Sequence, residues 1–258
     1  MPSRRRPFLL ALGLALALLT GCSGAGAAER TPGDHVTDAE AKVLADLLHQ
    51  DLVRGGADFT ETAPYAEGAV LTLTGTVDFT HGRGHATAVT TYSNGQPTDT
   101  RTLWFTDQTL WMGQVPNLAA TLSAAGLPAA PYVRRPLATS DANQDTPALI
   151  DVAAQLVLRL SAPKADDVRT FESGDYTWQG QRSINGRLAA EYRLASGARV
   201  AVAASDKTLL QYVTPLPGQG FSVTTTLTAH GPRTVDLPAD DQTVDLTSHP
   251  DVASALGM

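Results

Sequence analysis

The chain has 258 residues, 43% hydrophobic and 17% charged, which is the composition of an ordinary globular protein. It carries 26 acidic against 19 basic side chains, a formal net charge of −7. Nucleic-acid binding requires clustered Lys and Arg that neutralise phosphates, so this balance argues against a nucleic-acid partner. It argues equally against binding to anionic lipid through surface charge.

The N-terminus has the pattern of an export signal. Arg4, Arg5 and Arg6 precede an apolar run over residues 8–19. A membrane-spanning helix needs roughly 20 apolar residues, so this run is too short to cross a bilayer. A basic start followed by a short apolar run and small residues predicts a signal peptide.

The apolar run ends in Leu19-Thr20-Gly21-Cys22, and Cys22 is the single cysteine of the chain. This ending resembles the lipobox of bacterial lipoproteins. The resemblance implies that residues 1–21 are a lipoprotein signal peptide, that the Cys22 sulfur is acylated, and that the exported protein is anchored to the outer face of the cytoplasmic membrane. The alternative is a free cysteine beside an ordinary cleavage site. Residues 22–35, rich in Ser, Gly and Ala at their start, are expected to form a flexible tether.

Residues 37–54 are predicted to form the first helix. Thr37 and Glu40 have the spacing of a capping box, and Gly55 follows as a helix terminator. Apolar residues recur at helical spacing along one side: Val43, Leu44, Leu47, Leu48 and Leu52. This apolar side requires a hydrophobic partner surface.

Strict alternation of apolar and polar residues begins at residue 69 and predicts four antiparallel strands in sequence. They cover residues 69–79, 85–92, 101–106 and 109–112, with a tight hairpin around Asp107-Gln108. One face of this meander is apolar, and the other is rich in threonine.

A helical insert and a second set of strands follow. Residues 115–136 are rich in Ala and Pro, with one or two helical turns expected near Leu118 and Leu122. Asp145 or Thr146 is expected to cap a clearer helix that ends before Pro163. Short strands are then predicted at residues 175–179, 187–194, 198–204, 208–214, 221–229 and 234–237.

This order predicts an α+β fold, a large curved antiparallel sheet (a half-barrel) with helices packed on its concave face. The helices are the elements available to cover the apolar face of the sheet. We expect a single domain over residues 36–240, followed by a C-terminal tail over residues 241–258.

The helix, the meander "LTLTGTVDF…RTLWFTDQTLWM" and the later segments "INGRLAAEYRL" and "FSVTTTLTAHG" together resemble the actinobacterial lipoproteins of the LppX and LprG type. Those proteins share the half-barrel fold of the LolA-like lipid carriers. The resemblance implies a hydrophobic cavity between sheet and helices that accepts acyl chains of lipids, glycolipids or other acylated molecules. It also implies an envelope location, with an envelope transporter or another protein as a further partner; we expect a monomer.

The candidate lining of such a cavity is a set of apolar residues on the predicted sheet face and the central helix: Leu71, Leu73, Val77, Phe79, Leu103, Phe105, Leu110, Met112, Leu149, Val152 and Leu156. Taken singly, each of them is better explained as part of a plain core than as the lining of a cavity. Trp104, Trp111 and Trp178 lie near strand edges, where they would either frame an opening or pack as ordinary aromatics.

No motif indicates catalysis. The three residues between His81 and His85 include two glycines, which favours a hairpin turn over a metal site. The pairs Asp166-Asp167 and Asp240-Asp241 are interpreted as solvated surface. The sequence contains no Gly-x-Ser-x-Gly elbow, P-loop or His-Glu-x-x-His motif. We therefore expect no enzymatic activity, no cofactor and no metal. The alternative function is a surface interaction or sensory module on the same fold, with a filled interior and no lipid transport.

Overall fold

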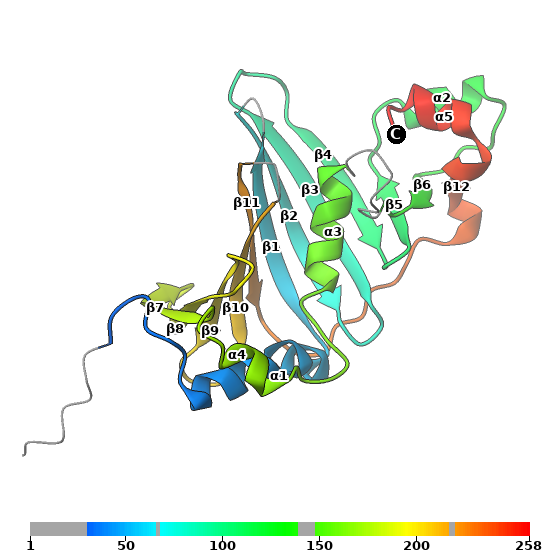
Figure 1. The fold of residues 1–258 in the computed structure, drawn as a ribbon. Helices are drawn as coiled ribbons and strands as arrows, with labels where there is room; N and C mark the ends of the chain where they lie inside the picture. The colour runs from blue at the N-terminus through cyan, green and yellow to red at the C-terminus, as the bar shows by residue number, and fades with distance from the viewer. Residues whose placement is uncertain (1–29, 66–67, 139–147, 217–219) are drawn as a thin grey trace, which may run out of the picture. The chain divides into compact units, whose positions relative to one another are not determined.

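The computed structural model describes residues 30–65, 68–138, 148–216 and 220–258 (Figure 1). Within the unit Thr31–Met258, the helices are α1 (Asp38–Arg54), α2 (Leu118–Ala124), α3 (Leu149–Leu158), α4 (Val168–Phe171) and α5 (Pro250–Ala255). Short 3₁₀ turns lie at Asp240–Gln242 and Leu246–Ser248.

The described residues form one sheet of twelve strands. The strands are β1 (Gly56–Tyr65), β2 (Ala69–Asp78), β3 (Arg83–Tyr92), β4 (Asp99–Phe105), β5 (Thr109–Gly113), β6 (Tyr132–Pro136), β7 (Thr177–Ile184), β8 (Arg187–Arg193), β9 (Arg199–Ala203), β10 (Leu209–Pro215), β11 (Ser222–Thr228) and β12 (Thr243–Asp245). Their order is β12-β6-β5-β4-β3-β2-β1-β11-β10-β9-β8-β7. All neighbours are antiparallel except β12 and β6, and the sheet does not close on itself.

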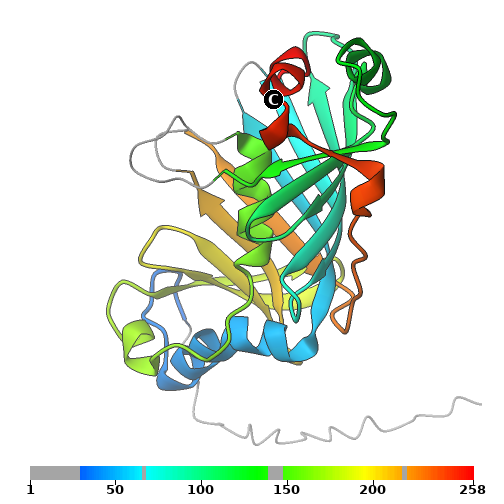
Figure 2. The same ribbon diagram turned by 90° about the vertical axis from the view of Figure 1, so that its right-hand side faces the viewer.

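The predicted fold class is confirmed: a large open, mostly antiparallel sheet carries helices on its apolar, concave side (Figure 2). On this side α3 contacts β1 and β3, and α1 contacts β10 and α4. Side chains from α1, α3 and strands of both halves of the sheet share one hydrophobic cluster, which includes Phe59, Leu103 and Val223. A small second cluster around Leu210 and Ala201 lies on the opposite face of the β7–β10 half.

Local signals located α1 correctly. The Glu40 N–H donates to Thr37 Oγ1 at 3.3 Å, and the Thr37 N–H donates to Glu40 Oε2 at 2.8 Å, which completes the capping box. Gly55 ends the helix in the left-handed conformation, with φ of 93°.

Three strands, β1, β6 and β12, were missed, and one expected strand is absent. β1 was missed because the acid Glu61 stands in its apolar row and Pro64, which disfavours a strand, stands in the other row. β6 was missed because it is short and carries Arg134 and Arg135. Residues 234–237 were expected to form a strand, but in the structure they have no regular secondary structure. The expected helix caps Asp145 and Thr146 lie outside the described residues, and the residue that precedes α3 is Ala148, with no side-chain cap.

Residues 241–258, which we expected to form a tail, contribute β12 and α5 to the folded unit. β12 extends the sheet by pairing in parallel with β6, so that Val244 lies opposite Val133. Val244, Leu246 and Val252 are buried in the main hydrophobic cluster. Burial of these three side chains stabilises the C-terminal segment against the edge of the sheet that β6 and β12 form.

Candidate functional site on the concave face

Eight predicted lining residues belong to the main core cluster on the concave face, seven of them on β2, β4 and β5 and Phe79 directly after β2. We call them the eight strand residues. Their exposed fractions run from 0% to 5%: Leu71, Leu73, Val77, Phe79, Leu103, Phe105, Leu110 and Met112. Phe105 packs edge-on against Phe59, with ring centroids 6.5 Å apart. Such low exposure means that protein atoms surround these side chains, so this half of the concave face is packed.

The three predicted lining residues on α3 have a different environment. Leu149, Val152 and Leu156 are half-buried, whereas the buried side of the helix consists of Asp151, Ala153, Ala154 and Val157. The predicted lining residues of α3 therefore do not form the side of the helix that faces the core most directly.

An ion pair fixes this orientation of α3. Arg135 on β6 donates two hydrogen bonds of 2.8 Å to the Asp151 carboxylate, and the Asp151 side chain is 1% exposed. The Ala138 N–H donates to the same carboxylate at 3.3 Å. A buried carboxylate requires such partners, so Asp151 must turn toward β6 and the leucines must turn outward.

Many apolar side chains that pack against the main core are only partly buried, and six of them lie on or beside α3 and the β10–β11 hairpin. We call this set the half-exposed apolar set; it comprises Leu149, Ile150, Leu156, Tyr212, Leu216 and Phe221. Its members come from α3 and from the β10–β11 hairpin, and α3 lies beside the strands on the concave side (Figure 2). Apolar surface on this side is thus incompletely covered by the described residues.

Glu61 is a functional candidate that sequence reasoning missed. It lies on the concave face of β1 between Phe59 and Ala63, opposite Leu73 on β2 and Thr225 on β11. The side chain is 1% exposed, and Thr225 Oγ1 donates to Glu61 Oε2 at 2.6 Å. The other oxygen, Oε1, has no hydrogen-bond partner among the described residues.

Burial raises the pKa of Glu61 to about 8, and the Thr225 hydrogen bond lowers it in part. The carboxyl group is therefore largely neutral at pH 7, because ionisation would leave a charge in an apolar surrounding. Thr225 in turn lies opposite Tyr212, so Glu61 is two strands away from the half-exposed apolar set. The sequence signal for this site is a single acidic residue in a row of apolar residues. It indicates a buried carboxyl group only once residues 56–65 are recognised as a strand.

Two of the three tryptophans do not face the concave side. Trp104 and Trp111 alternate with the buried residues of β4 and β5 and so lie on the outer face of the sheet. Trp104 stacks on His85 with centroids 4.9 Å apart and meets Tyr132 edge-on at 5.1 Å. Trp178 on the edge strand β7 packs against the main core and is half-buried.

The titratable pairs noted in the sequence are held in separate contacts. His81 Nδ1 lies 2.7 Å from Asp78 Oδ2, whereas His85 packs on Trp104. Asp167 pairs with Arg169, and Asp240 pairs with Arg134. Over the described ranges, no group of three or more His, Cys, Asp or Glu residues is placed to hold a metal ion.

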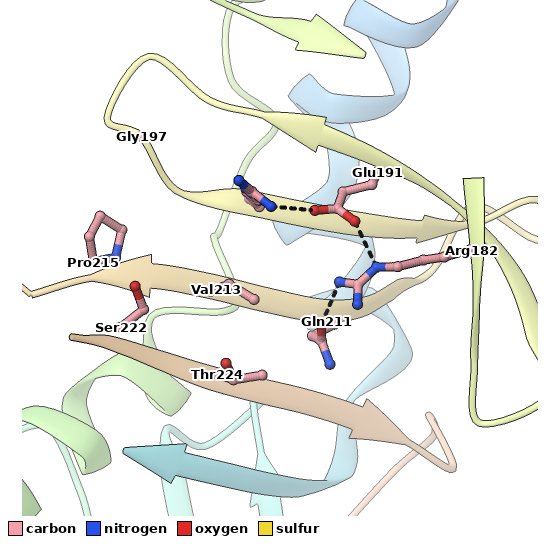
Figure 3. Close-up of a pocket in the computed structure, with 9 residues that line it drawn as sticks. Arg182, Glu191, Gly197, Gln211, Val213, Pro215, Ser222 and Thr224 are labelled. Atoms are coloured by element: carbon pink, nitrogen blue, oxygen red, sulfur yellow. Dashed lines mark hydrogen bonds and ion pairs between the residues drawn. The ribbon is translucent and has the colours of Figure 1, made fainter. Parts of the chain in front are cut away.

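A polar hollow lies on the outer face of the sheet, over β7–β11 (Figure 3). Its volume is about 640 Å³, and its lining includes Arg182, Glu191, Arg199, Gln211 and Thr224. These residues alternate with concave-face residues such as Val200 and Val223 along the same strands. The hollow is therefore separated from the apolar site by the thickness of the sheet.

Within the part of the chain that the structure describes, no helix has both the length and the apolar character needed to cross a membrane.

No family model and no curated protein matches the chain. Among solved structures, LprF from Mycobacterium bovis matches with a TM-score of 0.44 and 14% identity, over 78% of this chain and 98% of that one. An uncharacterized conserved protein from Thermus thermophilus matches with a TM-score of 0.40 and 10% identity, over 80% and 99% of the two chains. The LolA superfamily protein NE2245 from Nitrosomonas europaea matches with a TM-score of 0.24 and 12% identity, over 79% and 96%.

Proposed function

We propose that this protein is a lipid-anchored envelope protein whose concave face binds the acyl chains of lipids, glycolipids or other acylated molecules. The observation that carries the proposal is the half-exposed apolar set. Alkyl chains are bound by apolar surface with few directional groups, and these six side chains supply such surface next to a packed core.

The binding region in this proposal is smaller than the sequence suggested. The eight buried strand residues act as the packed floor of the domain, and the acyl chains lie against α3 and the β10–β11 hairpin. Leu149 and Leu156 are the members of the predicted lining that keep a direct role. The protein holds or passes on its ligand without a catalytic step.

The tether belongs to the same proposal. Cys22 lies outside the described residues, and its role rests on the lipobox resemblance. A thioether-linked diacylglycerol at Cys22 supplies two acyl chains, which is enough for stable membrane attachment. The domain would then work at the outer face of the cytoplasmic membrane and exchange ligand with an envelope transporter or another protein.

The second candidate function is an interaction or sensory module that carries no lipid. The packing of the eight strand residues, at 0% to 5% exposure, favours this alternative because it leaves no space beside them. In that case the half-exposed apolar set would contact a protein partner.

The two candidates are separated by measuring what copurifies with the protein and what it binds. Organic extraction and mass spectrometry of the purified chain are expected to return an acyl lipid, and a fluorescent fatty acid should bind and be displaced by it. Leu156→Ser and Phe221→Ser should weaken this binding about ten-fold, since each removes roughly 1.5 kcal/mol of apolar contact.

The matched control is Val53→Ser on α1, whose side chain is 65% exposed and outside the set. It should leave fatty-acid binding unchanged. An extract that contains no lipid, together with a protein captured through the same six side chains, would reject the carrier function in favour of the interaction module.

A further inference from the structure

The outer hollow over β7–β11 is a built polar site, and it is independent of the proposed lipid function. Two arginines border it, Arg182 from β7 and Arg199 from β9, and their side chains are 42% and 57% exposed. The guanidinium groups therefore remain accessible from solvent. Figure 3 shows Arg182 reaching toward Glu191 and Gln211 across the strands that form the floor of the hollow.

Glu191 holds both guanidinium groups in place. Arg182 Nε lies 2.7 Å from Glu191 Oε2, and Arg199 Nη1 lies 3.5 Å from Glu191 Oε1. The Glu191 side chain is 13% exposed, so one partly buried carboxylate serves two exposed cations. The hollow keeps an excess positive charge, whereas the whole chain has a net charge of −7.

The polar contacts continue across the floor of the hollow. Arg182 Nη2 donates to Gln211 Oε1 at 2.6 Å, and Gln211 Nε2 donates to Thr226 Oγ1 at 2.9 Å. Ser222 and Thr224 add hydroxyl groups to the lining. The site therefore offers charged donors, an amide and hydroxyls within one open depression.

Hydroxyl groups extend beyond the hollow across the outer face of the sheet. Cross-strand pairing places threonines side by side in two rows, spaced by about 4.8 Å from strand to strand. The rows are Thr224-Thr62-Thr72 and Thr226-Thr60-Thr74-Thr87-Thr102. A ligand longer than the hollow would meet a continuous series of hydroxyls on β11 and β1–β4.

We propose that this outer face binds an anionic saccharide, with its carboxylate or phosphate on Arg182 and Arg199 and its hydroxyls on Gln211, Ser222 and Thr224. A planar guanidinium pairs well with a carboxylate or phosphate, and a hydroxylated ring matches the amide and hydroxyl lining. None of the nine lining residues is aromatic, so the bases of single-stranded nucleic acid would have no side chain to stack on.

The test measures binding of galacturonate tetrasaccharide to the full-length chain by calorimetry, with maltotetraose as the uncharged counterpart and inorganic phosphate as the anion alone. The galacturonate chain should bind, weaken as salt is raised, and exceed both other probes in affinity. Arg199→Gln should weaken binding about ten-fold through the loss of a charged hydrogen bond, and Thr224→Val by a few-fold.

Arg169→Gln is the matched control, since Arg169 is an exposed arginine on α4 with side-chain exposure of 85%. It should change the affinity less than about two-fold. Equal binding of maltotetraose, equal binding of phosphate alone, or the same loss in Arg169→Gln as in Arg199→Gln would each overturn the saccharide site. Because fatty-acid binding is measured separately, failure of this site and failure of the lipid function are distinguishable.

Discussion

Thr225 Oγ1 donates a hydrogen bond of 2.6 Å to Glu61 Oε2 in the middle of the concave face. The two residues lie opposite each other on β11 and β1, separated by 164 residues in the sequence. Their contact places a largely neutral carboxyl group among the apolar side chains of the concave face.

Glu61 should make the folding stability of the protein depend on pH. Its pKa is raised by burial from 4.5 to about 8, so its contribution to stability is fully present below pH 4.5 and is lost as the pH rises toward 8. Over this window the slope from one such group is about 1.4 kcal/mol per pH unit. Urea unfolding of Glu61→Gln between pH 5 and pH 9 should show a flatter profile than the parent chain.

The pH dependence of stability that remains in Glu61→Gln should come from Asp51. Burial raises the pKa of Asp51 to about 8, and the nearby charge of Arg54 lowers it by a smaller amount. Burial lowers the pKa of His230, which acts in the opposite direction and at lower pH. Thr225→Val provides a second check, because loss of the hydrogen bond that lowers the pKa of Glu61 should extend the loss of stability to higher pH. A Glu61→Gln profile identical to that of the parent chain would contradict the buried, neutral state of Glu61.

The buried pair Arg135–Asp151 should fix α3 on the sheet. Asp151→Ala leaves the guanidinium without its carboxylate and should destabilise the protein by about 3 kcal/mol. Hydrogen exchange should rise first in Leu149–Leu158. The double variant Arg135→Met, Asp151→Leu restores apolar contact and should recover much of the lost stability; equal losses in both variants would argue against an ion-pair effect.

The packed and half-exposed parts of the concave face should respond differently to truncation. Leu103 is 0% exposed, so Leu103→Ala should cost about 2–5 kcal/mol. Leu156 is half-buried, and Leu156→Ala should cost only about 1 kcal/mol. Thermal unfolding of both variants checks this, and similar losses would show that α3 covers Leu156 more completely than the structure indicates.

The lipobox resemblance leads to a prediction in cells. Cys22→Ala should leave the protein without acyl chains and move it from the membrane fraction to the soluble envelope fraction, because the thiol is the attachment point. Cell fractionation and mass spectrometry of the N-terminal peptide check this, with Ser23→Ala as the neighbouring control. Persistence of Cys22→Ala in the membrane fraction would contradict the anchor.

The sequence by itself determined the elements that depend on near neighbours. The capping pair Thr37–Glu40 and the terminator Gly55 located α1, and the alternation in β2–β5 located the meander and its apolar face. Helix caps, hairpin turns and side-chain alternation all arise from residues a few positions apart, so a single sequence carries them.

Tertiary structure decided which of those apolar faces are filled and which polar groups are buried. β1 pairs with β11 far along the chain, and only that pairing gives Glu61 its partner Thr225. The rotation of α3 follows from Arg135 on β6, and the position of β12 follows from its parallel pairing with the same strand. These outcomes depend on burial and electrostatic satisfaction across the sheet, which no local pattern in the sequence encodes.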